Sequence, residues 1–363
     1  MDPLSIATPA LCVDASRLDA NLARVADYAR RHGLVWRPHV KTHKSPWVAA
    51  RQVAAGAVGV SCATVREAEV MRAVTDDLLL AYPPVGPDRL RRTAALATTS
   101  RLGVMLDGVE AAEALSAAVR AAGTTARVLV EVDAGMRRTG AADVSAAIEL
   151  AVRAAELPAL TFDGFGFYPG HLRTIGPEID GAIADLARLV AELREAAQRA
   201  GLAVATISCG STPLLWRSHE IVGATELRAG TAAYFDRTSV LGGVCTFEEC
   251  AVTVVATVVS TAVPGQVVLD AGVKAIGREP MRGADAPGYA CVVGRPDLVV
   301  TRLSEEHGVV ALEGTDWSPR VGDQVRLVPN HACVVTNMLD RVELVRGPAH
   351  EGPTPVAARG QVW

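Results

Sequence analysis

The stretch that decides the fold runs from residue 128 to residue 155, where VLVEVD (128–133) precedes VSAAIELAVRAA (144–155). The first segment is a short β-branched run typical of a buried strand, and the second has helical periodicity. Parallel strands need a long crossover between them, so a strand followed by a helix indicates a parallel sheet. The chain repeats this pattern up to about residue 235.

The alternation predicts eight strands, at residues 35–40, 58–61, 78–82, 102–106, 128–133, 160–167, 205–209 and 226–234. Helices are predicted at 17–32, 46–55, 66–74, 109–122, 144–155 and 177–200, with Ser16 and Asp19 as the N-terminal cap of the first. Eight strands suit a closed (β/α)8 TIM-type barrel. A doubly wound sheet is the competing fold, but no GxGxxG follows the first strand.

The sequence changes character after about residue 243. Strand-like segments at 252–261, 267–270, 289–293, 308–312 and 324–329 have little helical periodicity between them. We therefore expect a barrel domain over 1–243 and a β-rich domain over 244–346. The segment 347–363 is rich in proline and glycine and is predicted to be a loose tail.

Composition excludes several classes of protein. Among 363 residues, 36 basic and 40 acidic side chains give a net charge of −4, which argues against binding to nucleic acid or to an anionic membrane. The first residues, MDPLSIATPAL, lack the basic region of a secretory signal. Seven scattered cysteines without a CxxC pair favour reduced thiols and a cytoplasmic location.

Polar clusters follow several of the predicted strands, at the barrel face where active sites form. RPHVKTHK (37–44) places Lys41 at the end of the first strand, where a lysine can form a Schiff base, with His39 on the same strand face. SCGSTP (208–213) follows the seventh strand and predicts a helix N-terminus that binds a phosphate. A lysine of this kind together with a phosphate loop suggests pyridoxal phosphate. A solvated basic turn and an ordinary capped turn are the alternatives.

Two further clusters lie at the same predicted face. EVDAGMRRTG (131–140) offers an arginine that could keep a ring nitrogen unprotonated, or an Arg–Asp pair that closes the loop. FYPGH (167–171) offers the hydroxyl of Tyr168 and the imidazole of His171. The alternative for both side chains is simple packing.

The β-rich domain contains PNHAC (329–333). On an extended segment, the side chains of His331 and Cys333 would point to one face and could share an ion. Two ligands suit an open catalytic ion rather than a closed structural site, and a core cysteine beside an ordinary histidine is the alternative.

Taken together, these motifs resemble the D-threonine aldolase and D-serine dehydratase family of alanine-racemase-like (fold type III) pyridoxal-phosphate enzymes. The resemblance covers residues 8–346. It is carried by RPHVKTHK, EVDAGMRRTG, FYPGH, SCGSTP, ELRAGTAAYFD, LDAGVKA, SEEHG and PNHACVVTNMLD. It implies a barrel, a following β domain and a homodimer.

The resemblance also implies roles for individual residues. Lys41 matches the lysine bonded to the cofactor, Arg138 the arginine near the pyridine nitrogen, and Tyr168 the tyrosine beside the ring. The phosphate loop is matched by Gly210, Ser211 and Thr212, and the metal pair by His331 and Cys333. Thr64 matches a residue that makes a polar contact with the cofactor. His171 resembles the histidine that acts as a base in aldolases, but the residues around it are spaced differently.

The implied activity is a lyase reaction on a small D-β-hydroxy amino acid. A His-x-Cys pair resembles dehydratases and favours zinc, with manganese as the alternative, whereas FYPGH is also similar to aldolases. We therefore expect a dehydratase that forms a 2-oxo acid and ammonia, with a retro-aldol cleavage as the alternative. An amino-acid racemase would not need HAC (331–333), and a non-catalytic pyridoxal-phosphate carrier would not need the second domain.

Overall fold

The computed structural model describes residues 6–362 except 174, 175, 177, 283 and 284. Its residues divide into two compact units. The barrel unit comprises Arg24–Lys41, Pro46–Gly230 and the residues from Gln361. The β unit comprises the residues up to Ala23, Thr42–Ser45 and Thr231–Gly360. Each unit is described by itself.

The barrel unit contains eight parallel strands, as the sequence predicts. They are β2 (Val35–Trp36), β3 (Val60–Cys62), β4 (Asp77–Leu80), β5 (Arg101–Leu106), β6 (Ala126–Glu131), β7 (Leu160–Gly166), β8 (Thr206–Cys209) and β9 (Glu226–Leu227). Their order in the sheet is β2-β9-β8-β7-β6-β5-β4-β3. The sheet closes because Val58 N donates to Trp36 O and Ser61 N to Pro38 O, at 3.0 and 2.9 Å. The predicted (β/α)8 barrel is confirmed.

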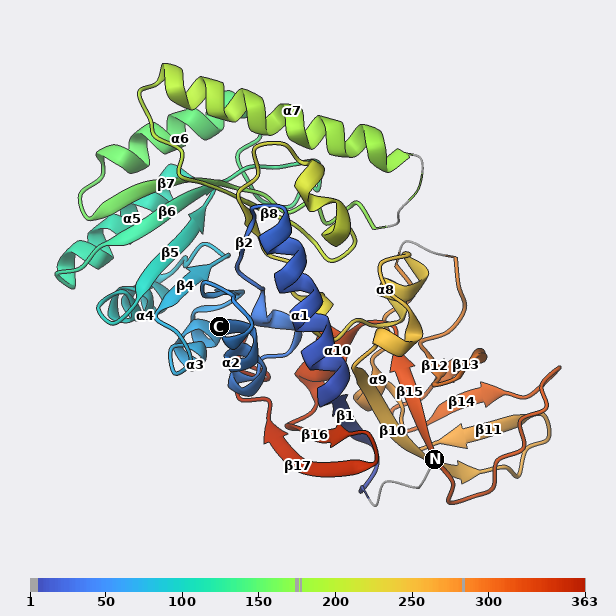
Figure 1. The fold of residues 1–363 in the computed structure, drawn as a ribbon. Helices are drawn as coiled ribbons and strands as arrows, with labels where there is room; N and C mark the ends of the chain where they lie inside the picture. Colours follow the sequence, from blue (N-terminus) through green and yellow to red (C-terminus); the bar gives the residue numbers. More distant parts are fainter. Residues whose placement is uncertain (1–5, 174–175, 177, 283–284, 363) are drawn as a thin grey trace. The chain divides into compact units, whose positions relative to one another are not determined.

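Helices follow the strands along the chain (Figure 1). They are α1 (Ala15–Arg31), α2 (Pro46–Ala54), α3 (Val65–Met71), α4 (Pro87–Ala97), α5 (Val109–Ala121), α6 (Val144–Glu156) and α7 (Glu178–Arg199). The sequence analysis missed α4. It also misplaced the cap of α1, because the Asp14 carboxylate accepts the backbone N–H groups of Ser16 and Arg17 at 2.9 and 3.1 Å. Asp14 therefore caps this helix, not Ser16.

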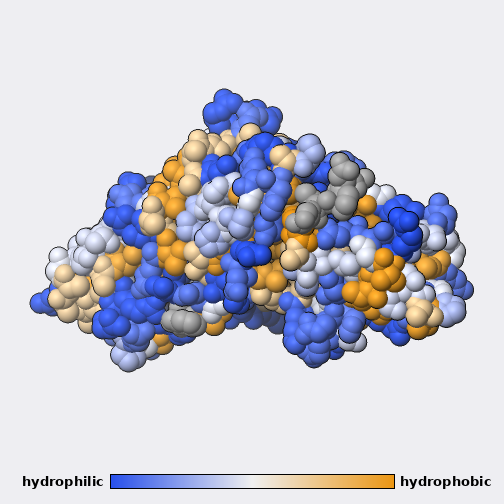
Figure 2. All heavy atoms as spheres, turned by 90° about the horizontal axis from the view of Figure 1, so that it is seen from below, coloured by the Kyte–Doolittle hydropathy of each residue, from blue (hydrophilic) through white to orange (hydrophobic). Residues whose placement is uncertain are grey.

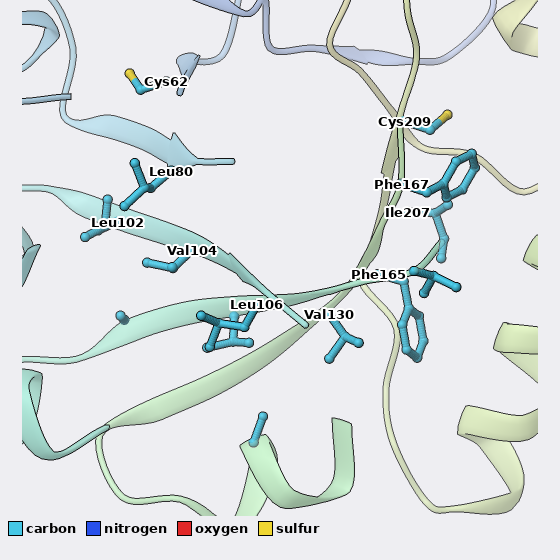
Figure 3. Close-up of a cluster of buried hydrophobic side chains, with 14 of the residues drawn as sticks. Cys62, Leu80, Leu102, Val104, Leu106, Val130, Phe165, Phe167, Ile207 and Cys209 are labelled. Carbon is cyan, nitrogen blue, oxygen red and sulfur yellow. The ribbon is translucent and has the colours of Figure 1, made fainter. Parts of the chain in front are cut away.

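The outer face of the barrel is apolar. Along β5, Leu102, Val104 and Leu106 are buried and belong to one large cluster with residues of β6, β7, β8 and the helices. Figure 3 shows part of this cluster, including Val130, Phe165 and Ile207. Alternate residues of a strand face opposite sides of the sheet, so the residues between these belong to the barrel interior.

The barrel interior holds a small apolar cluster of Leu79, Met105 and Leu129 and a network of ion pairs. Arg37 donates to Glu226 at 2.6 Å and to Asp77 at 2.7 Å, and all three side chains are buried. Asp77 also accepts from Arg127 at 2.9 Å and pairs with Arg101 at 3.2 Å. One buried carboxylate thus contacts three guanidinium groups, of which only that of Arg37 is buried.

The β unit is built on a nine-stranded sheet. Its strands are β1 (Ala10–Asp14), β10 (Val252–Ser260), β11 (Gln266–Leu269), β12 (Ala290–Val292), β13 (Arg295–Leu303), β14 (Gly308–Ala311), β15 (Gln324–Pro329), β16 (Arg341–Arg346) and β17 (Ala349–Pro355). The order is β11-β14-β13-β12-β15-β10-β1-β16-β17, and β10 also pairs with β11. Three short helices complete the unit: α8 (Arg237–Leu241), α9 (Val273–Ile276) and α10 (Ala332–Met338).

Two expectations about the ends of the chain were wrong. Strand β1 pairs with β10 and β16, so the first residues belong to the β unit rather than to the barrel. The segment 347–363 is not a loose tail, because β17 pairs along its length with β16. After β17, Gln361 O accepts a hydrogen bond from Thr64 Oγ1 at 3.0 Å, and its side chain accepts one from Arg66. The polar composition of this segment reflects an edge strand.

The molecular surface mixes polar and apolar side chains. Figure 2 shows hydrophilic residues interspersed with small groups of hydrophobic ones on the face that it presents. Among the described residues, no helix combines the length and the apolar character that crossing a membrane requires.

The Asp77 network yields a stability prediction. Asp77→Ala leaves Arg37, Arg101 and Arg127 without their shared carboxylate, so we expect the free energy of unfolding to fall by about 3–5 kcal/mol. Urea unfolding followed by circular dichroism measures this loss. The control Asp88→Ala removes an exposed partner of Arg91 and should leave the urea midpoint unchanged. Equal midpoints for both variants would contradict the importance of the network.

Candidate active site

Lys41 lies just beyond β2, one of the two shortest barrel strands. Regular pairing of β2 ends at Trp36, His39 forms an isolated bridge with Ser61, and the chain then enters a 3-10 turn, Val40–Thr42. The expected shared strand face of His39 and Lys41 was therefore wrong. Instead, His39 Nδ1 accepts the Lys41 backbone N–H at 3.3 Å. The histidine thus supports the turn that carries the lysine.

Tyr168 faces two cationic groups. Lys41 Nζ lies 5.2 Å from the centroid of its ring, and the Arg138 guanidinium carbon lies 5.4 Å from it. The ring packs directly against Gly170, where a Cβ would approach it within 2.2 Å. The structure thus brings Lys41, Tyr168 and Arg138 together at the carboxyl ends of the strands, as the sequence predicts.

The loop that carries Arg138 is held by Asp133. Its carboxylate accepts the backbone N–H groups of Gly135 and Arg137 at 3.0 and 2.9 Å. The alternative of an Arg–Asp pair closing this loop is replaced by this backbone interaction. His171 is exposed and packs on Gly135, where a Cβ would lie 3.1 Å from its imidazole.

Arg228 is a functional candidate that the sequence analysis missed. It is buried at the end of β9, where it donates to Ser208 Oγ at 2.5 Å and to Phe167 O at 3.0 Å. Gly166 lies beside it, although the close contact that a Cβ there would make is with Met105 Cε, at 2.6 Å. Arg138, by contrast, is exposed at the rim. The only sequence signal for Arg228 was its place in the motif ELRAGTAAYFD (226–236), within the predicted strand 226–234.

The charge of Arg228 is balanced by nearby carboxylates. Glu226 accepts a hydrogen bond from Ser208 Oγ, and Glu131 lies buried at the end of β6. Burial raises the pKa of Glu131, although a hydrogen bond from Thr139 and the charges of Arg228 and Arg138 oppose this rise. Burial also raises the pKa of the Cys209 thiol to about 12, so this cysteine is an unreactive core residue.

The predicted phosphate loop is buried and has an unsatisfied hydroxyl. Gly210, Ser211 and Thr212 follow β8, and Gly210 has a φ of +109°. Ser211 Oγ is buried and has no hydrogen-bond partner within the described part of the chain. A buried polar atom without a partner is costly, and an anion bound at this loop would satisfy it. The residues present therefore fit the phosphate group of a cofactor.

The expected helix N-terminus at this loop was wrong. A 3-10 helix starts only at Leu215 and ends at Glu220, so Pro213 is not its first residue. The loop itself, rather than a helix end, would bind the anion.

Thr64 is engaged elsewhere. Its side chain accepts the backbone N–H of Glu67 at 3.1 Å as the N-cap of α3, and its hydroxyl donates to Gln361 O. Both interactions belong to the local fold, and the proposed cofactor contact would have to share this hydroxyl.

In the β unit, His331 and Cys333 lie close together but not on an extended segment. Strand β15 ends at Pro329, His331 is the N-cap of α10, and Cys333 lies in its first turn. The expected geometry of alternate strand residues was therefore wrong. The two side chains still interact. Burial lowers the pKa of His331, but the charge of Cys333 and the hydrogen bonds that His331 makes to Asp236 and Cys333 raise it to about 10.

The side chains of His331 and Cys333 form a donor set that suits one divalent ion. A thiolate and an imidazole are ligands that zinc prefers, and a bound cation would displace a proton from His331. Within the described residues, no cluster of three or more His, Cys, Asp or Glu side chains is arranged to hold a metal. The donor set therefore fits an open site that solvent or substrate completes.

The carboxyl end of the parallel barrel carries a half-buried lysine, a loop with an unpartnered buried hydroxyl, and an aromatic ring. These features fit a pyridoxal-phosphate enzyme of the alanine-racemase-like class. Residues 13–238 match the alanine racemase N-terminal domain, and residues 251–345 match the putative serine dehydratase domain. The chain belongs to the D-threonine aldolase and D-serine dehydratase family, which confirms the resemblance.

Individual relatives represent both activities of this family. D-threonine aldolase from Arthrobacter sp. is 34% identical, covering 99% of this chain and 94% of the relative. D-threo-3-hydroxyaspartate dehydratase from Delftia sp. strain HT23 is 35% identical, covering 91% and 92%. The crystal structure of D-threonine aldolase from Filomicrobium marinum superposes with a TM-score of 0.89 at 33% identity, covering 99% and 97%.

The unpartnered hydroxyl of Ser211 predicts opposite effects on the stability of the cofactor-free protein and on its affinity for the cofactor. Ser211→Ala removes an unsatisfied buried group, so the cofactor-free protein should gain about 1 kcal/mol of stability. The same change should weaken pyridoxal-phosphate binding about 10-fold, because a hydrogen bond to the phosphate is lost. Unfolding in urea and fluorescence titration measure the two effects.

The matched control is Ser218→Ala. Ser218 is buried as deeply, but its hydroxyl donates to Leu214 O at 2.9 Å. This variant should lose stability and bind the cofactor with unchanged affinity. An unchanged affinity for Ser211→Ala would place the phosphate elsewhere.

Proposed function

We propose that the chain is a pyridoxal-phosphate- and divalent-metal-dependent dehydratase that converts D-serine or D-threonine to a 2-oxo acid and ammonia. The observation that carries the choice of reaction is the Cys333 thiol beside His331. A soft sulfur ligand favours zinc over harder ions, and zinc suits departure of the β-hydroxyl as hydroxide. Manganese is the alternative ion.

The cofactor is proposed to lie among the side chains at the barrel mouth. Pyridoxal phosphate, when bound, acts as an electron sink for the Cα of a substrate amino group. Lys41 would hold the cofactor through Nζ, and this amine can accept a proton when it is free. Ser211 Oγ and the Gly210–Thr212 loop would bind the phosphate, and the Tyr168 ring would lie beside the cofactor.

The arginine that faces the ring nitrogen is reassigned in this proposal. Arg138 was expected in that role, but it is exposed and contacts the Tyr168 ring. Arg228 is buried inside the barrel and fixed by Ser208 and Phe167. A fixed, permanently charged guanidinium there would keep a neighbouring ring nitrogen unprotonated, so we propose Arg228 for it.

His331 and Cys333 would hold the divalent ion. A bound ion supplies a Lewis acid for the β-hydroxyl of the substrate. His171 is proposed as an accessory acid or base at the rim, supported by its exposed imidazole on the loop next to Tyr168. A cytoplasmic location and a homodimer complete the proposal.

Retro-aldol cleavage to glycine and an aldehyde is the second candidate. It is supported by the 34% identity to the Arthrobacter D-threonine aldolase across nearly the whole chain. The two reactions differ in the bond that breaks: Cα–H and then Cβ–O in the dehydratase, and Cα–Cβ in the aldolase.

Product analysis separates these candidates. With D-threonine, zinc and pyridoxal phosphate, we expect 2-oxobutanoate and ammonia in equal amounts and in excess over glycine. With D-serine we expect pyruvate and ammonia, and with either L-enantiomer no turnover. Glycine and acetaldehyde alone would establish the aldolase, and D/L interconversion alone would establish a racemase.

Metal removal should affect bond cleavage more than substrate binding. Chelation, or His331→Ala, should leave the spectral shift of the cofactor on addition of D-serine and abolish lyase activity. Addition of zinc should restore the chelated protein but not the variant. Full activity in protein shown to be metal-free by elemental analysis would refute the metal dependence.

A second test of the metal site replaces the Cys333 ligand by another donor instead of removing it. Cys333→Asp keeps two donors but replaces sulfur by oxygen, so the preferred ion should shift from zinc toward manganese. We expect the ratio of ammonia to aldehyde to fall with it. An unchanged metal preference would mean that Cys333 is not a ligand.

A further inference from the structure

Both proposed metal ligands contact side chains from one segment that has no role in the proposed function. This segment, Thr231–Asp236, is the end of ELRAGTAAYFD (226–236) and lies in the β unit with His331 and Cys333. Thr231 begins a short 3-10 turn, and Asp236 is the N-cap of α8. These two residues bracket a largely buried stretch of chain.

Asp236 holds the imidazole of His331. Its Oδ2 lies 3.3 Å from His331 Nδ1 and also accepts the backbone N–H of Ala332 at 3.0 Å. Its Oδ1 accepts the backbone N–H and the hydroxyl of Ser239 at 2.9 and 2.7 Å. A carboxylate fixed in this way binds Nδ1–H and leaves Nε2 as the free nitrogen of the ring.

Two threonine hydroxyls surround the sulfur of Cys333. Thr42 Oγ1 lies 3.3 Å from Cys333 Sγ, Thr231 Oγ1 lies 3.8 Å from it, and the two hydroxyls are 3.3 Å apart. Thr42 is fully buried and directly follows Lys41 in the chain. Two hydroxyls at these distances fix the position of the sulfur, and partners that orient a metal ligand influence the affinity of the site.

We propose that Asp236 and the Thr42–Thr231 hydroxyl pair are positioning residues for the metal ligands. Asp236 fixes the tautomer and the direction of His331, and the two hydroxyls fix the position of the Cys333 sulfur. This inference rests on the proposed metal site. It adds three residues that determine how tightly the ion is held.

Metal binding by the cofactor-loaded, full-length protein tests the inference. Zinc affinity is measured by competition with a chromogenic chelator, and the environment of the ion by the ligand-field bands of cobalt(II). Asp236→Asn retains a helix cap and Thr42→Val retains the shape, so both variants are expected to fold. Each should weaken zinc binding about 10- to 100-fold and shift the cobalt bands.

Two controls separate positioning from folding. Thr42→Ser restores the hydroxyl and should restore both the affinity and the bands. Thr336→Val removes a buried hydroxyl in the same helix as Cys333, one that bonds to Ala332 O at 2.9 Å, and should leave both unchanged. Wild-type affinity and unshifted bands in Asp236→Asn, Thr42→Val and Thr231→Val would overturn the inference.

Failure of the metal site itself gives a different result. If Cys333→Ala binds zinc as tightly as the wild type, or the wild type binds none, the proposed site is wrong and the inference falls with it. If Cys333→Ala loses zinc and the threonine and aspartate variants do not, only the inference is wrong.

Discussion

The hydrogen bonds that join β2 to β3 close the barrel, and the position of Lys41 depends on them. Strand β2 has only two regularly paired residues. It pairs with β9 on one side, and on the other Trp36 O and Pro38 O accept from Val58 N and Ser61 N. Closure fixes the backbone as far as the His39–Ser61 bridge, two residues before the lysine. A short strand in a closed barrel thus presents a reactive side chain from a rigid support.

The mixed polar and apolar interior is the second consequence of closure. Inside the barrel, the ion pairs around Asp77 accompany a small buried apolar cluster of Leu79, Met105 and Leu129. The carboxyl end of the barrel presents Arg228, Tyr168 and the Gly210 loop.

Periodicity predicted much of this fold. The eight barrel strands, the β-rich second part and the rim position of Lys41, Arg138 and Tyr168 were all expected from alternation and strand ends. Local patterns could not predict features that depend on distant contacts. The pairing of β17 with β16, the placement of β1 and the capping of α1 by Asp14 are of this kind.

In the candidate site too, local sequence patterns predicted some features and missed those that depend on distant contacts. The motif residues were found, but their geometry was not: His331 caps a helix, and the phosphate loop precedes a 3-10 turn. Arg228 and Asp236 were quoted within a motif without a role, because only the structure reveals a buried charge and its partners.

Borohydride reduction of the holoenzyme, followed by peptide mapping, tests the central claim most directly. The account predicts the cofactor label on the peptide that contains Lys41, and a label on Lys44 or Lys274 would contradict it.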